Sequence, residues 1–178
     1  MKELKLMKCH IQAIACMLLA ASSAFAYGET GQQLENGLIH ALQLKPGTSE
    51  RSGYSGKAIQ AYMQAGLVGR KPNQRFDYTD YYLVAKGATF LSHELVLIEE
   101  EYITQYIGCC VSPGAGITVK VSGSTKNLAA FAKTNRCTLL DPVDLNHALR
   151  DVAIKARFPE AHYASLSCRE RDADRDDD

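Results

Sequence analysis

The sequence predicts an α+β domain built on a mainly antiparallel sheet of about four or five strands, covered by about four helices and cross-linked by two disulfides. Three observations lead to this prediction. Segments rich in Tyr, Val, Ile and Thr fill the middle of the chain, helical patterns flank them on both sides, and four cysteines follow an N-terminal export signal.

The export signal occupies residues 1–26, which we interpret as a cleaved signal peptide. Three lysines precede a mostly apolar stretch from Ile11 to Ala21, and Ala24-Phe25-Ala26 fits the small-residue cleavage pattern. The apolar stretch is too short for a membrane anchor. It also continues past Cys16, which argues against a lipidated cysteine. We therefore expect a periplasmic or secreted bacterial protein without stable membrane insertion, starting at Tyr27.

Composition limits the partners and the domain boundaries. Residues 27–178 hold 17 Lys and Arg against 19 Asp and Glu, a net charge of −2. This balance argues against nucleic acid, because phosphate binding needs clustered surplus cations. The last ten residues, 169–178, contain three Arg, six acidic residues and no large apolar residue. This composition predicts a disordered charged tail, which leaves 27–168 as a single α+β domain.

The first two elements are predicted to be helices that cover the sheet. Leucines at helical spacing run from Thr30 to Leu44 and stop before Pro46. A second helical pattern begins at Ala58 and ends near Gly66.

The strands follow, bounded by glycine or polar links. Four segments have strand-forming composition: Phe76 to Val84, Glu94 to Glu101, Tyr102 to Val111, and Ile117 to Val121.

Two helices and a final strand complete the expected fold. Ser124 or Thr125 can cap the first of these helices. Asp141-Pro142 is a typical N-cap and N1 pair for the second, which carries apolar residues as far as Ile154. His162 to Arg169 is expected to form the last strand.

The four cysteines after the signal predict two structural disulfides. Cys109 and Cys110 are neighbours on a predicted strand, so their side chains point to opposite faces. A bond between the two would need a distorted peptide, which leaves each to find a separate partner. The favoured pairing is Cys109–Cys137 with Cys110–Cys168, and the crossed pairing is the alternative. The chain has no Cys-x-x-Cys, which argues against a redox or zinc site.

The sequence predicts no catalytic motif, metal site or cofactor site. We therefore favour a non-enzymatic function over an enzymatic one. The stretch from Gly53 to Ala58 differs from a phosphate loop at two required positions. Strict strand alternation places His93, Glu99 and Glu101 on one side, where they could hold a metal or form a general-base site. A solvated hairpin end is the favoured interpretation of these three residues.

Tyrosines beside carboxylates give the strongest surface signal. Tyrosine offers a large contact area at modest entropic cost, and carboxylates suit a basic protein partner. The alternative is that these tyrosines are half-buried sheet residues. The candidate partner surface consists of Tyr78, Asp80, Tyr82, Glu99, Glu101 and Tyr102.

Three functions fit these observations. The leading one is an exported, non-enzymatic binding domain of a bacterial cell envelope, such as an inhibitor or immunity-type protein that acts on a hydrolase or toxin. The second is a structural or secretion-accessory component of the envelope. The third is a small secreted hydrolase with His93 and Glu99 as candidate residues.

Overall fold

The computed structural model describes residues 31–101 and 112–174. The chain divides into two compact units, Met1–Gln33 and Leu34–Asp178, and the second unit contains the whole sheet. The predicted signal peptide and the predicted strand 102–111, with Tyr102, Cys109 and Cys110, lie outside the described residues. Within the described ranges, no helix is both long and apolar enough to cross a membrane.

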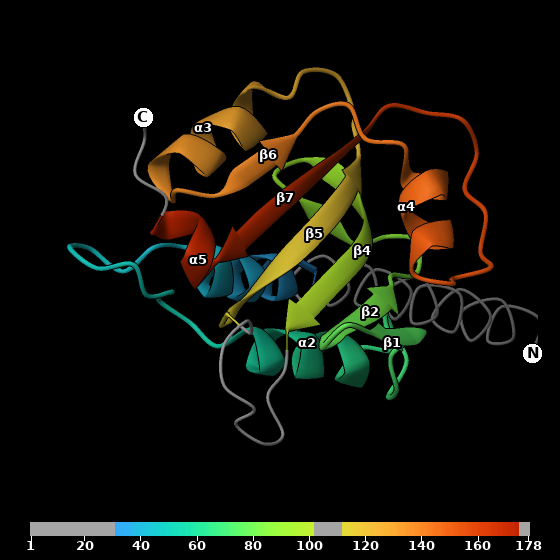
Figure 1. Cartoon of the computed structure of the whole chain (residues 1–178), viewed down its shortest axis with the longest axis horizontal. Coiled ribbons are helices and arrows are strands. Elements are labelled where there is room, and N and C mark those ends of the chain that lie inside the picture. The colour runs from blue at the N-terminus through green and yellow to red at the C-terminus, as the bar shows by residue number, and fades with distance from the viewer. Residues whose placement is uncertain (1–30, 102–111, 175–178) are drawn as a thin grey trace, which may run out of the picture. The chain divides into compact units, whose positions relative to one another are not determined.

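The described residues of the second unit form one antiparallel sheet of seven strands. Figure 1 shows how its longer strands lie side by side. The order is β1-β2-β4-β5-β7-β6, and β3 pairs with β4 beside this path. The strands are β1 (Gln74–Phe76), β2 (Thr79–Leu83), β3 (Thr89–Phe90), β4 (His93–Glu101), β5 (Gly114–Lys120), β6 (Thr138–Leu140) and β7 (Tyr163–Arg169). The predicted α+β class with an antiparallel sheet is confirmed.

The predicted strand count was too low for two physical reasons. The segment expected as one strand from residue 76 to 84 starts at the last residue of β1 and crosses a hairpin turn into β2, because Asp77 and Tyr78 turn the chain with φ of 46° and 61°. The short strands β3 and β6 have two and three residues, too few to give a recognisable alternation.

The described helical segments cover the two faces of the sheet unequally. Three helical segments pack on one face: residues 34–42 of the helix over residues 31–42, α2 (Ser55–Gln64) and α3 (Lys126–Thr134). Helix α4 (Leu145–Asp151) packs on the other face. We call these the three-helix face and the α4 face. The three-helix face buries the larger core, which includes Leu38, Leu42, Ile59, Tyr62, Ile98, Ile117 and Leu128. The α4 core is smaller and includes Val96, Leu97, Leu145, Leu149 and Tyr163.

Two helix predictions are corrected. The N-cap of α4 is Asp144, whose carboxylate accepts a hydrogen bond from the His147 N–H at 2.9 Å, so Asp141-Pro142 does not begin this helix. A fifth described helix, α5 (Glu170–Ala173), lies in the segment predicted as a disordered tail. Asp172 and Ala173 are buried there, so residues 169–174 are part of the ordered structure.

A β-bulge in β4 decides which residues face which side. Leu95 pairs with Val119 and Leu97 pairs with Thr118, so Val96 is an extra residue in the strand. Val96 and Leu97 consequently both contact the α4 core, and the alternation is reversed beyond them.

The disulfide pairing differs from both predicted connectivities. Cys137 is bonded to Cys168, with the two Cα atoms 4.5 Å apart. The pairing of β6 with β7 explains this bond, because Thr138 lies opposite Ser167 and the preceding cysteine therefore meets Cys168. This is the one disulfide within the described residues. Because Cys137 and Cys168 bond to each other, neither can bond to Cys109 or Cys110.

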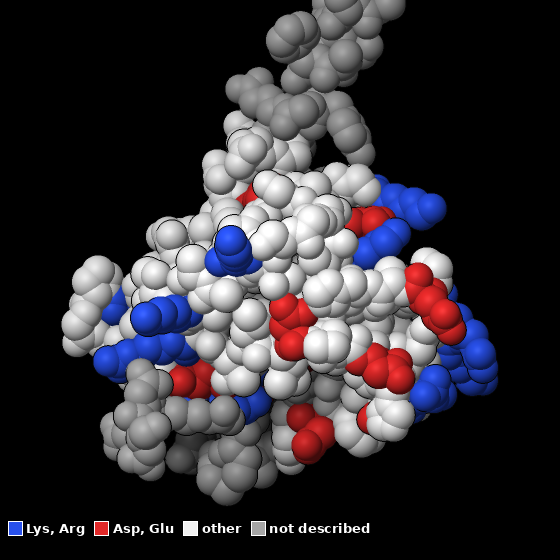
Figure 2. Space-filling model, turned by 90° about the horizontal axis from the view of Figure 1, so that it is seen from above, with Lys and Arg blue, Asp and Glu red and all other residues white. Residues whose placement is uncertain are grey.

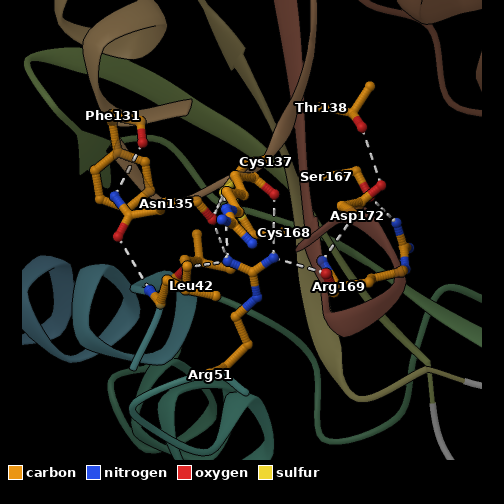
Figure 3. Close-up of a disulfide and its surroundings, with 12 residues drawn as sticks. Leu42, Arg51, Phe131, Asn135, Cys137, Thr138, Ser167, Cys168, Arg169 and Asp172 are labelled. Atoms are coloured by element: carbon orange, nitrogen blue, oxygen red, sulfur yellow. Dashed lines mark hydrogen bonds between the residues drawn. A yellow bond between two sulfur atoms is a disulfide. The ribbon is translucent and has the colours of Figure 1, made fainter. Parts of the chain in front are cut away.

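A buried arginine connects this disulfide to the helices (Figure 3). Arg51 Nη1 donates to the carbonyl oxygens of Leu42 at 3.1 Å and Asn135 at 2.6 Å, and Nη2 donates to the carbonyl of Arg169 at 2.7 Å. Nη1 also lies 3.7 Å from Cys137 Sγ. Burial lowers the pKa of Arg51 from its ordinary value. One guanidinium thus joins the end of the 34–42 helix to the segment after α3 and to the end of β7.

Candidate binding site

The α4 face carries an open polar region beyond the part that α4 covers. This region contains a cavity of about 660 Å³. We call it the hairpin cavity, because the turn between β1 and β2 forms part of its rim. Its lining residues are Phe76, Asp77, Tyr78, Thr79, Tyr81, Glu99, Glu101, Val152, Arg169 and Arg171.

Two arginines and two glutamates form a continuous ion-pair network in the hairpin cavity. Arg169 Nη2 lies 3.2 Å from Glu99 Oε2. Arg169 Nε lies 2.6 Å from Glu101 Oε1, a close ion-pair contact whose angle falls outside that of a hydrogen bond. Arg171 contacts both oxygens of Glu101, with Nη1 donating to Oε2 at 2.7 Å. The network therefore joins β4 to β7 and α5.

The network contains a buried part and an accessible part. The side chains of Arg169 and Glu101 are 8% and 5% exposed, whereas those of Glu99 and Arg171 are 21% and 46% exposed. Buried charges must be paired, and Glu101 is fully used by its two arginines and by the Ser112 N–H at 2.8 Å. The groups available to a ligand are therefore Glu99 and Arg171.

The backbone around the network holds Arg169 in place. Asp172 Oδ2 accepts bonds from the Arg169 N–H at 2.9 Å and from Ser167 Oγ at 2.7 Å. Ser167 Oγ in turn accepts from Arg169 Nη1 at 2.7 Å. Gly116 leaves the space for the ion pair, because a Cβ there would lie 3.1 Å from Glu99 Oε2. The floor of the cavity is thus preorganised.

The rim of the cavity exposes two aromatic side chains. Phe76 is 49% exposed and Tyr78 is 44% exposed, and both belong to the β1–β2 hairpin. Two-residue hairpin turns with positive φ at both positions strongly favour Asn-Gly or similar pairs. Asp77-Tyr78 occupies this turn instead, so the hairpin presents a large ring at a backbone conformation that disfavours it.

The structure brings together three of the six residues predicted as a partner surface. Tyr78, Glu99 and Glu101 all line the hairpin cavity. Asp80 instead accepts bonds from Arg75 at 2.6 and 2.7 Å, and Tyr82 packs in the core of the three-helix face. The sixth residue, Tyr102, lies outside the described residues.

Asp80 and Tyr82 also form part of a local polar contact. The Tyr82 hydroxyl donates to Asp80 Oδ2 at 3.4 Å. Burial, followed by the charge of Asp80, raises the pKa of Tyr82 to about 12. Its hydroxyl therefore stays protonated at neutral pH as part of the packed sheet.

His93 does not join the glutamates, because the bulge reverses the alternation between them. His93 is 1% exposed and contacts Asn127 at the start of α3, whereas Glu99 and Glu101 lie on the α4 face. Its Nδ1 accepts a bond from the Ser122 N–H at 3.1 Å, so the proton is on Nε2, which lies 3.0 Å from Asn127 Oδ1. Both ring nitrogens are satisfied, and His93 is a structural residue.

A second cavity of about 440 Å³ lies at the start of α2, and we call it the α2 cavity. Ser55 Oγ donates a hydrogen bond to Glu100 Oε1 at 2.7 Å inside it. Burial is the largest influence on Glu100 and raises the pKa of this carboxyl, whereas the Ser55 bond lowers it and the nearby charge of Asp80 raises it. The α2 cavity therefore contains a hydroxyl aligned on a carboxylate that is more basic than usual.

A scan against models of protein families and searches of curated proteins and solved structures each found no match. In the part of the chain that the structure describes, no group of three or more His, Cys, Asp or Glu side chains could hold a metal ion.

Surface charge alone does not mark a site. On the face shown in Figure 2, Lys and Arg side chains lie among Asp and Glu side chains, and neither sign covers that face. Arg169 and Arg171, the cations of the hairpin cavity, were not among the predicted site residues. Arg169 was expected both as the last residue of the final strand and as the first residue of the tail, and its alternation with Ser165 and Ser167 could have placed it on one face of the sheet. Arg171 was assigned to the tail alone.

Proposed function

We propose that this protein is an exported, non-enzymatic binding domain of a bacterial cell envelope that holds a protein partner at the hairpin cavity. The observation that supports this proposal most is the exposed pair Phe76 and Tyr78 on the rim of a preorganised polar cavity. Exposed aromatic residues are enriched in protein interfaces, where they bury a large area at low entropic cost.

The turn conformation supports a binding role for Tyr78. Holding a tyrosine at positive φ costs roughly 1–2 kcal/mol compared with the same residue in its usual conformation at negative φ. Unfavourable backbone conformations of this kind concentrate at functional sites. A contact between the Tyr78 ring and a partner would offset the cost of this conformation.

The charges of the cavity indicate a basic group on that partner. Three carboxylates and two guanidiniums line it, which leaves one net negative charge. Asp77 lies on the exposed hairpin and Glu99 is partly accessible, so a Lys or Arg side chain of the partner would approach these two carboxylates. Such rim charges affect association rate and specificity more than affinity.

Replacing Tyr78 by glycine tests partner binding in a variant whose stability is not expected to fall. The Tyr78→Gly variant relieves the positive φ, so we expect an unfolding free energy equal to that of the wild type or up to about 1 kcal/mol higher in urea denaturation. Immobilised wild-type protein should retain a partner from envelope extract, and Tyr78→Gly should lose it.

Tyr54→Ser is the matched control, because Tyr54 is an exposed tyrosine at the N-cap of α2, away from the hairpin cavity. It should retain the partner. Equal retention by both variants would contradict the proposal. A single stoichiometric enzyme whose activity falls on binding would support inhibition, and a multi-subunit assembly would support the accessory role.

A small hydrolase, the third function expected from the sequence, is the alternative proposal, and the Ser55–Glu100 pair supports it in place of His93. In such a reaction Ser55 Oγ would attack an acyl carbon while Glu100 takes its proton, and that proton would pass to the leaving group. The N–H groups of Ser55 and Gly56, in the first turn of α2, have no intrahelical acceptor and could stabilise the oxyanion. Water would then release the acyl group from Ser55.

Covalent labelling tests this candidate directly. A fluorophosphonate probe should label the wild-type protein at Ser55, and Ser55→Ala should abolish the labelling. The rate should fall at pH values below the raised pKa of Glu100, because the protonated carboxyl cannot act as a base. Ser52→Ala, which changes another serine of the α2 cavity, should leave labelling unchanged. Absence of labelling in the wild type would eliminate the hydrolase.

A further inference from the structure

Three cations border one cavity beyond the C-terminal end of α4. Arg150, Lys155 and Arg157 are exposed and line a space of about 350 Å³. We call it the α4 basic cavity. It shares no lining residue with the hairpin cavity or the α2 cavity.

The chain path brings these cations together. The N–H of Ala153 donates to the carbonyl of Arg150 at 2.9 Å, and the N–H of Ile154 donates to that of Leu149 at 2.8 Å. Ala153 adopts φ of 61°, a conformation that usually requires glycine. This turn reverses the chain after α4, so that Lys155 comes back towards the helix end.

Packing and hydrogen bonds fix the returning segment. Ile154 is 6% exposed and lies in the core beside α4. The Asn146 side chain forms two bonds with the backbone of Phe158, donating to its carbonyl and accepting from its N–H, each at 2.9 Å. The segment from residue 153 to 157 is therefore anchored on both sides, and the cavity does not depend on a free loop.

The three cations are not neutralised within the described residues, where none of them forms an ion pair. The adjacent acid, Asp151, contacts His147 Nδ1 at 2.9 Å instead. Three neighbouring positive charges without a counter-charge repel one another and raise the free energy of the unliganded protein. The negative end of the α4 dipole offsets this only in part, because α4 has seven residues and the effect is limited to its last turn.

We propose that the α4 basic cavity binds a phosphate-bearing anion. Arginine guanidiniums match the oxygens of a phosphate in a two-bond fork, and lysine adds a point charge. Arg150 and Arg157 supply two forks and Lys155 supplies the third cation, on a cavity at the lower end of the size range for small ligands. This site does not depend on the function proposed for the hairpin cavity.

Phosphate and pyrophosphate at constant ionic strength test the proposal in the full chain. Isothermal titration and thermal unfolding should both detect binding, with pyrophosphate tighter than phosphate. The variant R150Q/K155Q/R157Q should weaken binding by at least about tenfold, because it removes all charge-assisted bonds. The control K71Q/K86Q/K133Q changes net charge equally at exposed lysines elsewhere and should change binding less than about twofold.

A vesicle arm identifies the source of the phosphate group. Sedimentation with vesicles of phosphatidylglycerol and phosphatidylcholine, lost in the site variant but retained in the control, would indicate a lipid headgroup. Binding of the soluble anions without vesicle binding would indicate a free phosphate compound. Equal binding by the site variant and the control, or no binding of any probe by the wild type, would overturn the proposal.

Discussion

Replacing Arg51 by alanine is expected to lower the unfolding free energy by about 3–5 kcal/mol, a large fraction of the stability of a small domain. The guanidinium donates to the carbonyls of Leu42, Asn135 and Arg169, which lie in three separate elements. Its removal takes the guanidinium donor away from all three of these acceptors at once. Denaturant unfolding of the purified full chain measures the loss.

Two further variants identify the cause of that loss. Arg51→Lys keeps the positive charge but lacks the planar fork, so it should lose more than half of the same free energy. Arg70→Ala removes an exposed arginine and should change stability by less than about 0.5 kcal/mol. Arg51→Ala with near wild-type stability would show that the three carbonyls find water or other donors.

Removal of the Cys137–Cys168 disulfide should have an effect of similar size. The two cysteines are 31 residues apart, and a cross-link over a loop of this length stabilises the folded state by about 3–4 kcal/mol in the chain-entropy estimate. We therefore expect the Cys137→Ala/Cys168→Ala variant to unfold at a much lower denaturant concentration. The slope of the transition should also change, because the unfolded chain becomes less compact.

Peptide mapping without reduction checks the pairing itself. It should recover one peptide pair that joins Cys137 to Cys168. Cys137→Ala alone should be destabilised nearly as much as the double variant, since either change removes the cross-link. Recovery of Cys137 joined to Cys109, or alkylation of Cys137 in the native protein, would contradict the structure.

The fold class could be predicted because strand-forming composition and helical spacing depend on residues that are close together in the chain. Strand-forming composition marked β2, β4, β5 and β7, and Gly66, with φ of 72° just after α2, ends that helix where expected. The shortest strands and α5 escaped because two to four residues carry no periodicity. These elements form through pairing with neighbouring strands and through contacts of buried groups such as Asp172. Such contacts exist only once the chain is folded.

The candidate site could be predicted only in part. Tyr78, Glu99 and Glu101 were chosen for their chemistry, and they do line one cavity. His93 was grouped with the glutamates by strict alternation, and one extra residue at Val96 was enough to separate them. A bulge leaves no clear mark in the composition of a strand, so this separation required the register of β4 against β5.

Local sequence patterns were enough to predict the class of the fold and the approximate positions of the main strands and helices, because these depend on residues close together in the chain. The near-balanced charge follows from composition alone. The tertiary structure decided the Cys137–Cys168 pairing, the face on which Glu99 lies, the contacts of Arg51 and the grouping of Arg150 with Lys155 and Arg157. These features depend on strand register and chain reversal, which bring together residues whose separation along the chain carries no signal of their contact.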